Sequence, residues 1–306
     1  MPAARAGASL PAEVRIREVG PRDGLQAEEP LAVDDRVRLV DALSASGLRE
    51  IEAVSFVSPT AVPAMAGAAE VMARVARRDD VSYVALVPNV KGAELALEAG
   101  VDGLNVTISA SPAYNEKNVR RTIPESLSAI GEIVARAGGL WVDVTVSCAF
   151  GSPYEGDIPP LDVASLARQI LDRGATSLTF ADTTGMATPR RVAELVDAVG
   201  TNIRLHFHET RGTGLVNAFC ALQLGVADFD TSVGGLGGSP FAHGAGGNLA
   251  TEGLVAMLDD LGVRTGVSVD SLVEAAALVS TLVGRPVPSA VAHAGPRSRL
   301  AGAGAS

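Results

Sequence analysis

The sequence predicts an α/β protein with the architecture of a TIM (β/α)8 barrel, a glycine-rich lid loop after the eighth strand and additional helices at the C-terminal end. Two observations predict this fold. Short runs of β-branched residues alternate with amphipathic helices, and eight such alternations fit in a chain of 306 residues. An open doubly wound sheet stays the structural alternative, because the number of strands is read from one sequence.

The expected strands are short apolar runs rich in β-branched residues. They cover residues 14–19, 50–54, 82–86, 103–108, 141–147, 177–181, 203–208 and 228–233. No block of charge, proline-rich linker or change in composition divides the chain between them. We therefore expect one barrel domain over residues 13–290, with loose tails at 1–12 and 291–306.

Helix signals lie between these runs. In the segment 162–174, apolar residues recur at helical spacing, and Gly174 is placed to end the helix. Its apolar positions are Val163, Leu166, Ala167, Ile170 and Leu171. The next helix is expected to have Thr188 as its N-cap and Pro189 in its first turn.

Composition excludes several classes of protein. With 47% hydrophobic and 20% charged residues, the chain can bury a large core, which excludes disorder for most of its length. The 25 basic and 35 acidic residues give a net charge of −10, so neither nucleic acid nor an anionic membrane is expected as the main partner. A small anionic substrate would need a local cationic site.

The two cysteines, Cys148 and Cys220, are too few for a disulfide scaffold and fit a reducing compartment. No uncharged apolar run approaches the length of about 20 residues that a bilayer span needs. Residues 1–11 are too short for a signal or transit peptide. We therefore expect a cytoplasmic protein with no membrane partner.

Polar side chains gather where the expected strands end, which is where the active sites of such barrels lie. They are Glu18, Arg22, Asp23, Glu52, Ser55, Asn89, Ser109, Ser111, Ser147, Cys148, Asp182, His206 and His208. Charged groups beside a buried strand are costly unless they pair or bind a ligand. For Arg22 and Asp23, the alternative interpretation is a surface turn.

His206 and His208 are separated by one residue in an expected strand, so both side chains point to the same face. If that face is the barrel interior, the two imidazoles form half of a metal site, and Asp23 is placed to add a carboxylate oxygen. Such a mixed nitrogen and oxygen set suits Mn²⁺, Mg²⁺ or Zn²⁺. The alternative is a strand that carries two hydrogen-bonded histidines.

A glycine-rich segment, 234–248, follows the eighth expected strand. It does not match a dinucleotide-binding fingerprint, because Pro240 interrupts it and the strand–helix context is absent. Its place above the barrel mouth favours a lid, and a slack linker is the alternative.

Several motifs in register resemble the 3-hydroxy-3-methylglutaryl-CoA lyase family from about residue 14 to residue 262. They are Glu18-Val-Gly-Pro-Arg-Asp-Gly-Leu-Gln26, Ile51-Glu52, Phe56-Val-Ser-Pro59, Ser147-Cys-Ala-Phe-Gly-Ser-Pro-Tyr-Glu-Gly156, Asp182-Thr-Thr-Gly185, His206-Phe-His208, Ser232-Val-Gly-Gly-Leu-Gly-Gly238 and Gly247-Asn-Leu-Ala-Thr-Glu252. The resemblance implies a divalent cation, Mg²⁺ or Mn²⁺, as cofactor and an acyl-CoA as substrate. It also implies a homodimer and a role in leucine degradation and ketone-body formation.

The implied reaction splits hydroxymethylglutaryl-CoA into acetyl-CoA and acetoacetate by retro-Claisen cleavage. Asp23, His206, His208 and Asn248 match the metal ligands of the family. Arg22 matches the residue that binds the thioester oxygen, and Glu52 matches the carboxylate that orients Arg22. Gln26 and Asp182 match substrate-binding positions. The proton of the substrate hydroxyl is expected to go to Asp23 or to His206.

One departure concerns the lid, where the family has a cysteine that acts as an acid and this chain has Ser239. A serine hydroxyl is a far weaker acid than a thiol. Three interpretations stay open: His243 supplies the proton directly or through Ser239, the enzyme acts on a different acyl-CoA, or the protein is slow or inactive. The alternative functions are therefore a carbon–carbon lyase for another branched 3-hydroxyacyl-CoA and a non-catalytic acyl-CoA-binding protein.

Three further sets of residues bear on these expectations. Glu209 and Arg211 depart from the family pattern and are expected either to reshape the pocket or, for Arg211, to form a solvated helix start. Cys148 is expected to be a small buried hydrophobe without a catalytic role. Four basic residues are expected either to meet the CoA phosphates or to be solvated. They are Lys91, Lys117, Arg120 and Arg121.

Overall fold

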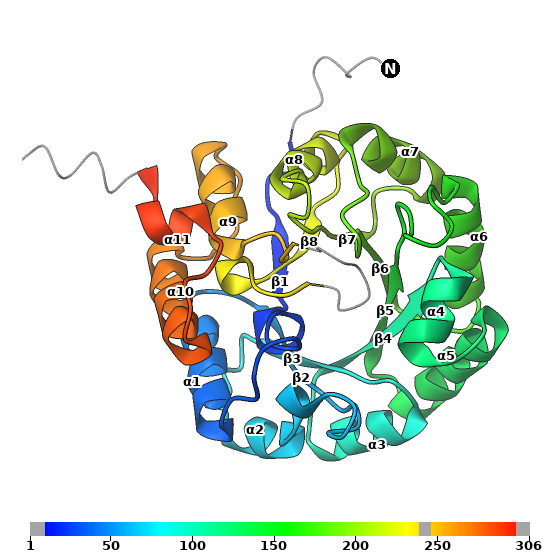
Figure 1. Ribbon diagram of the computed structural model, residues 1–306, viewed down its shortest axis with the longest axis horizontal. Coiled ribbons are helices and arrows are strands. Elements are labelled where there is room, and N and C mark those ends of the chain that lie inside the picture. Colours follow the sequence, from blue (N-terminus) through cyan, green and yellow to red (C-terminus); the bar gives the residue numbers. More distant parts are fainter. Residues whose placement is uncertain (1–9, 239–245, 298–306) are drawn as a thin grey trace, which may run out of the picture.

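A computed structural model describes residues 10–238 and 246–297 of the chain. Eight parallel strands form a closed barrel in which each strand pairs with the next and β8 pairs with β1 (Figure 1). The strands are β1 (Arg15–Glu18), β2 (Glu50–Ser55), β3 (Ser82–Leu86), β4 (Gly103–Ser109), β5 (Trp141–Ser147), β6 (Ser177–Ala181), β7 (Arg204–His206) and β8 (Asp228–Thr231). The predicted barrel and all eight predicted strands are confirmed, and the pairing of β1 with β8 excludes the open sheet.

Helices surround the strands, mostly in the order of the sequence (Figure 1). They are α1 (Val33–Ser44), α2 (Ala68–Arg74), α3 (Val90–Glu98), α4 (Pro112–Val119), α5 (Ile123–Ala137), α6 (Pro160–Leu171), α7 (Pro189–Val199), α8 (Gly214–Gln223), α9 (Thr251–Asp260), α10 (Val269–Val283) and α11 (Ala290–Ala294). Short helical turns form η1 (Gly20–Gly24), η2 (Pro63–Met65) and η3 (Val233–Gly235). None of the helices in the described ranges is long and apolar enough to cross a membrane.

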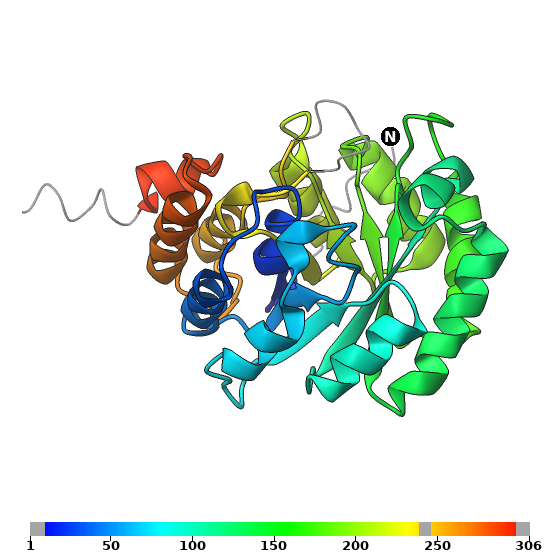
Figure 2. The same ribbon diagram turned by 60° about the horizontal axis from the view of Figure 1, so that its bottom comes forward.

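The additional C-terminal helices are confirmed. α10 packs against α1 and α9, and α11 packs against α9 and α10. Figure 2 shows these two helices, in orange and red, outside the barrel beside α1. The proposed domain limits of 13 and 290 stay a prediction, and α11 covers the first residues of the segment expected to be a tail.

Local signals explain several helix limits. The Thr188 side chain accepts a hydrogen bond from the Arg191 amide at the start of α7, as its N-cap position predicts. α6 begins at Pro160, two residues before the predicted start, because proline suits the first turn. It ends at Leu171, and Gly174 then adopts a left-handed conformation with φ of 89°.

The barrel interior is polar, whereas the apolar core lies between the strands and the helices. Along β5, Asp143 faces inward, because it accepts a hydrogen bond from Arg17 of β1 across the barrel. Since side chains alternate along a strand, the buried Val142, Val144 and Val146 face the helices. Many barrels of this class instead fill the interior with branched aliphatic residues.

An ion network, which we call the interior network, occupies the lower part of this interior. It consists of Arg17, Glu50, Asp143, Arg204 and Asp230. Arg17 is fully buried, donates to Asp143 at 3.0 Å and lies 2.8 Å from Asp230. Both oxygens of Glu50 accept hydrogen bonds from Arg204 at 2.7 Å. Because each buried charge has opposite charges beside it, the penalty for its desolvation is offset.

Candidate active site

The turn η1 presents Arg22 and Asp23 at the carboxyl end of β1. It is a π-helical turn, in which the amides of Gly24 and Leu25 donate to the carbonyls of Val19 and Gly20 at 3.2 and 3.0 Å. Gly20 is needed there, because a Cβ atom would lie 2.6 Å from Oε1 of Glu18. Such wide turns are frequent at functional sites.

Arg22 is buried and joins two carboxylates. Its Nε and Nη2 lie 2.8 and 2.6 Å from Oε2 of Glu52, and its Nη1 donates to Oδ1 of Asp23 at 2.7 Å. Although burial favours the neutral guanidine, Glu52 and Asp23 raise the pKa of Arg22. The surface-turn alternative is therefore wrong, because both partners fix the guanidinium inside the barrel mouth.

Glu52 is itself held from the opposite side. Its Oε1 accepts a hydrogen bond from Nδ2 of Asn105 on β4 at 2.9 Å, and Oδ1 of Asn105 accepts one from the Thr145 hydroxyl on β5 at 2.9 Å. All three side chains are buried. This chain of contacts spans β2, β4 and β5 and restricts the rotation of the Glu52 carboxylate.

His206 and His208 face each other at the mouth, with their Nε2 atoms 3.1 Å apart. Nδ1 of His206 lies 3.2 Å from Oδ2 of Asp230, and Nδ1 of His208 lies 3.1 Å from the carbonyl oxygen of Gly246. Both acceptors favour a hydrogen on Nδ1, which leaves the two Nε2 lone pairs directed at one another. That arrangement is repulsive unless a proton or a cation lies between the two rings.

Asn248 and Asp23 complete this group. Nδ2 of Asn248 donates to Oδ2 of Asp23 and to the carbonyl of Leu236, both at 2.8 Å. Oδ1 of Asn248 is buried without a hydrogen-bond partner among the described residues. One ligand atom each of Asp23, His206 and His208 lie within 4.8 Å of one another. The predicted juxtaposition of the histidines with Asp23 is thus confirmed, and the donor set fits a divalent cation.

Electrostatics in this cluster are strongly perturbed. Burial favours the neutral acid, yet Arg22 and the two histidines lower the pKa of Asp23 to about 2. Burial and the charge of His206 lower the pKa of His208 to about 4. Burial also lowers the pKa of His206, but its hydrogen bond to Asp230 reverses the effect and raises it. The site therefore holds an ionised carboxylate beside a neutral imidazole.

The two ends of the glycine-rich segment are tied to this site. His208 and Asn248 form an antiparallel bridge, and the amide of Glu209 donates to the carbonyl of Gly247 at 2.8 Å. This pairing explains why β7 ends at His206 rather than at the predicted residue 208. At the other end, a Cβ atom at Gly237 would lie 2.4 Å from Nδ2 of Asn248.

The chain matches the HMGL-like family model over residues 13–279. It belongs to the HMGL-like family. It is 44% identical over 294 residues to the 3-hydroxy-3-isohexenylglutaryl-CoA/hydroxymethylglutaryl-CoA lyase of Pseudomonas aeruginosa, covering 94% of this chain and 98% of that one. It is 42% identical to the mitochondrial hydroxymethylglutaryl-CoA lyase of Bos taurus, covering 94% and 90% of the two chains.

A solved structure of an HMG-CoA lyase from Acinetobacter baumannii, in complex with coenzyme A and 3-methylmalate, is also similar. It has a TM-score of 0.89 and 40% identity, covering 94% of this chain and 96% of that one. The fold and the sequence of this HMGL-like protein are therefore similar to those of hydroxymethylglutaryl-CoA lyases over nearly the whole chain. The family resemblance inferred from the motifs is confirmed.

Four predicted site residues lie outside the cluster or outside the described ranges. Gln26 is half-buried in the turn after η1, and no hydrogen bond of its side chain to another described residue is found. Asp182 is buried, and its Oδ1 accepts the Ala187 amide at 2.8 Å, which supports the loop after β6. Burial raises the pKa of Asp182 to about 7. Ser239 and His243 fall in residues 239–245, outside the described residues.

Glu18 points away from the barrel interior, because its neighbour Arg17 points into it. Oε1 of Glu18 accepts the amides of Gly20 and Val233, and its Oε2 accepts the Thr251 hydroxyl at 2.6 Å. The nearby Glu252 accepts the Gly234 amide at 2.8 Å. Burial raises the pKa of Glu18 to about 7 and that of Glu252 to about 8. These carboxyls hold the backbone at the start of the glycine-rich segment.

Glu209 and Arg211, the two residues after His208 that depart from the family pattern, stabilise loops. Glu209 accepts the amides of Gly214 and Leu215 at 3.2 and 3.0 Å and so caps α8. Nη1 of Arg211 donates to the carbonyls of Thr184 and Gly185 at 3.0 and 2.7 Å. Arg211 therefore joins the loops after β6 and β7 instead of forming a merely solvated helix start.

Cysteine positions are consistent with packing roles. Cys148 is buried at the end of β5, where burial raises the pKa of its thiol to about 12. Burial also raises the pKa of the half-buried Cys220 on α8. A thiol with a raised pKa forms little thiolate at neutral pH and is a poor nucleophile.

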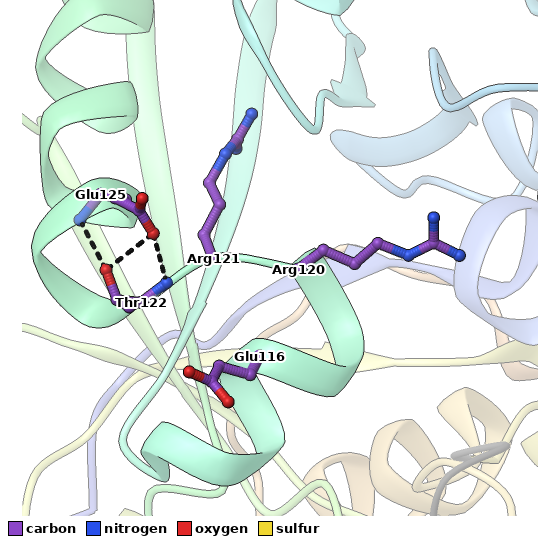
Figure 3. Close-up of a pocket in the computed structure, with 5 residues that line it drawn as sticks. All are labelled: Glu116, Arg120, Arg121, Thr122 and Glu125. Atoms are coloured by element: carbon purple, nitrogen blue, oxygen red, sulfur yellow. Dashed lines mark hydrogen bonds between the residues drawn. The ribbon is translucent and has the colours of Figure 1, made fainter.

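A shallow pocket of about 280 Å³ lies at the turn between α4 and α5 (Figure 3). Arg120 and Arg121 extend from this turn in different directions, and Nη1 of Arg121 donates to the carbonyl of Pro88. Thr122 and Glu125 form the capping box that starts α5. Arg121 thus has a structural contact, whereas the expected contact with CoA phosphates stays a prediction.

No local pattern in the sequence marks Asp230 or Asn105 as a site residue, and Glu252 stands there only as the last residue of a family motif. Asn105 and Asp230 are polar residues within buried strands, where Asp230 follows the buried Phe229 on β8. Glu252 is a buried polar residue in the first turn of α9. A carboxylate in a buried strand is costly without partners. That cost was the available signal, and the partners became visible only in the folded chain.

Proposed function

We propose that this HMGL-like protein is a carbon–carbon lyase that cleaves a 3-hydroxy-3-methylglutaryl-type acyl-CoA into acetyl-CoA and acetoacetate. One observation carries the proposal: Arg22, fixed by Glu52, adjoins the donor set of Asp23, His206, His208 and Asn248. The sequences and structures of hydroxymethylglutaryl-CoA lyases that match most of the chain support it.

Asp23, His206, His208 and Asn248 would hold a divalent cation, and we propose Mg²⁺ or Mn²⁺. The unpartnered Oδ1 of Asn248 and the facing Nε2 atoms of the histidines support this assignment. When bound, the cation supplies Lewis-acid polarisation and a template for the oxygens of the substrate.

Arg22 would bind the thioester oxygen. A guanidinium has five N–H groups, and the contacts to Glu52 and Asp23 use Nε and one N–H on each terminal nitrogen. The remaining N–H groups are available to a substrate oxygen. When the bond between C2 and C3 breaks, its electrons move onto the thioester, and the fixed positive charge of Arg22 stabilises the enolate that forms.

Two proton transfers complete the balance of the reaction. The tertiary hydroxyl loses its proton to Asp23, because His206, the other candidate, carries a hydrogen on Nδ1 and would use Nε2 to hold the cation, which leaves it no free lone pair. The enolate carbon then gains a proton to give acetyl-CoA. The family uses a lid cysteine for this step, and here the donor is His243, acting directly or through Ser239, or water if the substrate differs.

A second candidate function is cleavage of a more branched 3-hydroxyacyl-CoA. The Pseudomonas aeruginosa relative is named for both an isohexenyl and a methyl substrate, which favours this candidate. A non-catalytic acyl-CoA-binding protein is disfavoured, because Arg22, Glu52 and the donor set all keep their contacts. We also propose a homodimer in the cytoplasm, on the family resemblance and the two unpaired cysteines.

The test is acetyl-CoA release by purified protein with Mg²⁺ or Mn²⁺, from hydroxymethylglutaryl-CoA and from its isohexenyl analogue. The variant Ser239→Cys is assayed beside the wild type. Turnover of the methyl substrate by the wild type would support the proposal, and loss of that turnover in His243→Ala would assign the proton donor.

Other outcomes discriminate between the alternatives. A silent wild type with an active Ser239→Cys variant would mean that the scaffold fits the substrate but lacks its acid. Turnover of the isohexenyl substrate alone would favour the second candidate. If both proteins bind metal but release no acetyl-CoA from either substrate, the lyase proposal is wrong.

A further inference from the structure

Asp230 lies beside His206 on the neighbouring strand and joins the mouth to the interior network. In the barrel register it pairs with His206 on β7 and with Arg17 on β1. Its Oδ2 lies 3.2 Å from Nδ1 of His206, and its two oxygens accept hydrogen bonds from Nε and Nη2 of Arg17 at 2.9 and 2.8 Å. Asp230 is buried, so water does not compete for these contacts.

An ionised carboxylate accepts hydrogen bonds but cannot donate them. Arg17, which is fully buried, keeps Asp230 in this form by its charge and by its two hydrogen bonds. His206 must therefore carry its hydrogen on Nδ1, and its Nε2 lone pair then points towards Asp23 and His208. The ring cannot turn without losing the hydrogen bond to Asp230.

We propose that Asp230 is a positioning residue, which selects the tautomer of His206 and aims its Nε2 atom at the cation site. This inference rests on the proposed metal site. Carboxylates that hold a ligating histidine in this way commonly change metal affinity or activity by about 10- to 100-fold when they are replaced.

The competing explanation is that Asp230 only neutralises Arg17. Asp143 offers a matched control, because it is also fully buried and its Oδ2 accepts from Nη1 of Arg17 at 3.0 Å. Its other contacts are the hydroxyls of Ser177 and Thr179, and no contact with His206 is found among the described residues. A charge-neutralising role would make the two carboxylates equivalent.

The experiment compares Asp230→Asn with Asp143→Asn. An asparagine offers one acceptor atom where the carboxylate offers two, so Arg17 and His206 compete for it. Binding of Mn²⁺ alone is followed by the electron paramagnetic resonance of the free ion, and thermal unfolding is recorded without metal. We expect both variants to lower Tm, but only Asp230→Asn to weaken Mn²⁺ binding by at least about tenfold.

Equal weakening by both variants, or none by Asp230→Asn, would overturn the inference. A second measurement does not depend on the stability of a variant: nitrogen-15 NMR of wild-type protein loaded with Mg²⁺. We expect a protonated Nδ1 and an unprotonated Nε2 for His206, and the opposite tautomer would overturn the inference.

A failure of the proposed function can be distinguished from a failure of this inference. Mn²⁺ binding without acetyl-CoA release would overturn the reaction and leave the role of Asp230 testable by affinity. If wild-type protein bound no Mn²⁺, the positioning role would be wrong together with the cation site.

Discussion

Two levels of the barrel interior carry charged side chains, and they satisfy their hydrogen bonds differently. In the interior network, both oxygens of Glu50, Asp143 and Asp230 accept hydrogen bonds from described residues. At the mouth, Oδ1 of Asn248 has no hydrogen-bond partner in the described part of the chain, and two imidazole nitrogens face each other at 3.1 Å. The carboxylates of the lower level thus have all their oxygens hydrogen-bonded, although Nε of Arg204 makes no hydrogen bond to a described residue and lies 3.5 Å from Oδ1 of Asp230. The upper level leaves acceptor atoms without partners.

The charge balance is the same at the two levels, since each has one more carboxylate than guanidinium, but the groups beside the charges differ. At the mouth, Arg22 is one positive charge beside the two carboxylates of Asp23 and Glu52. The mouth therefore has one negative charge in excess beside the neutral donor atoms of His208 and Asn248, which suits a cation. An unpartnered buried atom alone does not mark a ligand site, since Nε of Arg204 and Oε2 of Glu252 also lack partners among the described residues. The mouth differs because such an atom lies there beside two facing imidazole nitrogens and an ionised carboxylate.

The largest expected effect is the loss of activity in His208→Ala, which disrupts the group of donor atoms at the mouth. Because this variant removes one nitrogen donor of the cation site, we expect acetyl-CoA release to fall at least about a thousandfold, which equals about 4 kcal/mol of transition-state stabilisation. The free energy of unfolding should change by only about 1 kcal/mol, since no ion pair is lost. His293→Ala, which removes an exposed histidine of α11, is the control and should keep full activity. Retained turnover in His208→Ala would contradict the comparison.

Removing a cation from the interior network should mainly lower the free energy of unfolding. Arg17→Met leaves Asp143 and Asp230 buried without their main cation, so we expect the free energy of unfolding to fall by about 3–5 kcal/mol. Arg15→Met is a matched control on the same strand, because the Arg15 side chain is 70% exposed and its pair with Asp228 should contribute less than about 1 kcal/mol. Chemical denaturation measures both. Equal losses would show that burial of the network does not matter.

A smaller effect concerns Glu252, whose carboxyl has no cation beside it in the described ranges. Its folded-state pKa, raised to about 8 by burial and by Glu18, lies above the usual value for an unfolded chain. Its contribution to stability is therefore present at pH below about 4.5 and is lost as the pH rises through about 8. The permanently neutral Glu252→Gln should thus gain stability relative to the wild type between pH 5.5 and 8.5, by about 3 kcal/mol.

Thermal unfolding over this pH range checks the last prediction, with Glu274→Gln on the exposed side of α10 as control. Parallel pH profiles of Glu252→Gln and the wild type would contradict it. A gain in Glu252→Gln would show that a buried carboxyl next to the barrel is held neutral by its surroundings, unlike the carboxylates of the interior network and of the mouth.

The fold was largely predictable because strands and helices follow local periodicity. The limits of β3, β5 and β6 agree with the expected runs, while β7 is shorter because residues 207 and 208 pair with the segment that starts at Gly247. The residues proposed as metal donors were predictable as a group, because strand spacing and the family motifs place them at the mouth.

The supporting groups were not predictable from local pattern. Asp230 and Asn105 act on His206 and Glu52 through contacts between strands that are far apart in the sequence. The interpretation of Glu18 changed for a related reason. Its side chain follows the opposite face of β1 from Arg17, and only the contact of Arg17 with Asp143 identifies which face is inside.

The cysteines have a practical consequence for site-specific labelling. Maleimides and other electrophiles react with thiolates, and both native thiols of this chain have raised pKa values, that of Cys148 to about 12. A single cysteine introduced at the 54% exposed Val216 should therefore react much faster than either native thiol. A fluorophore or spin label can then be attached at one position while both native cysteines are kept.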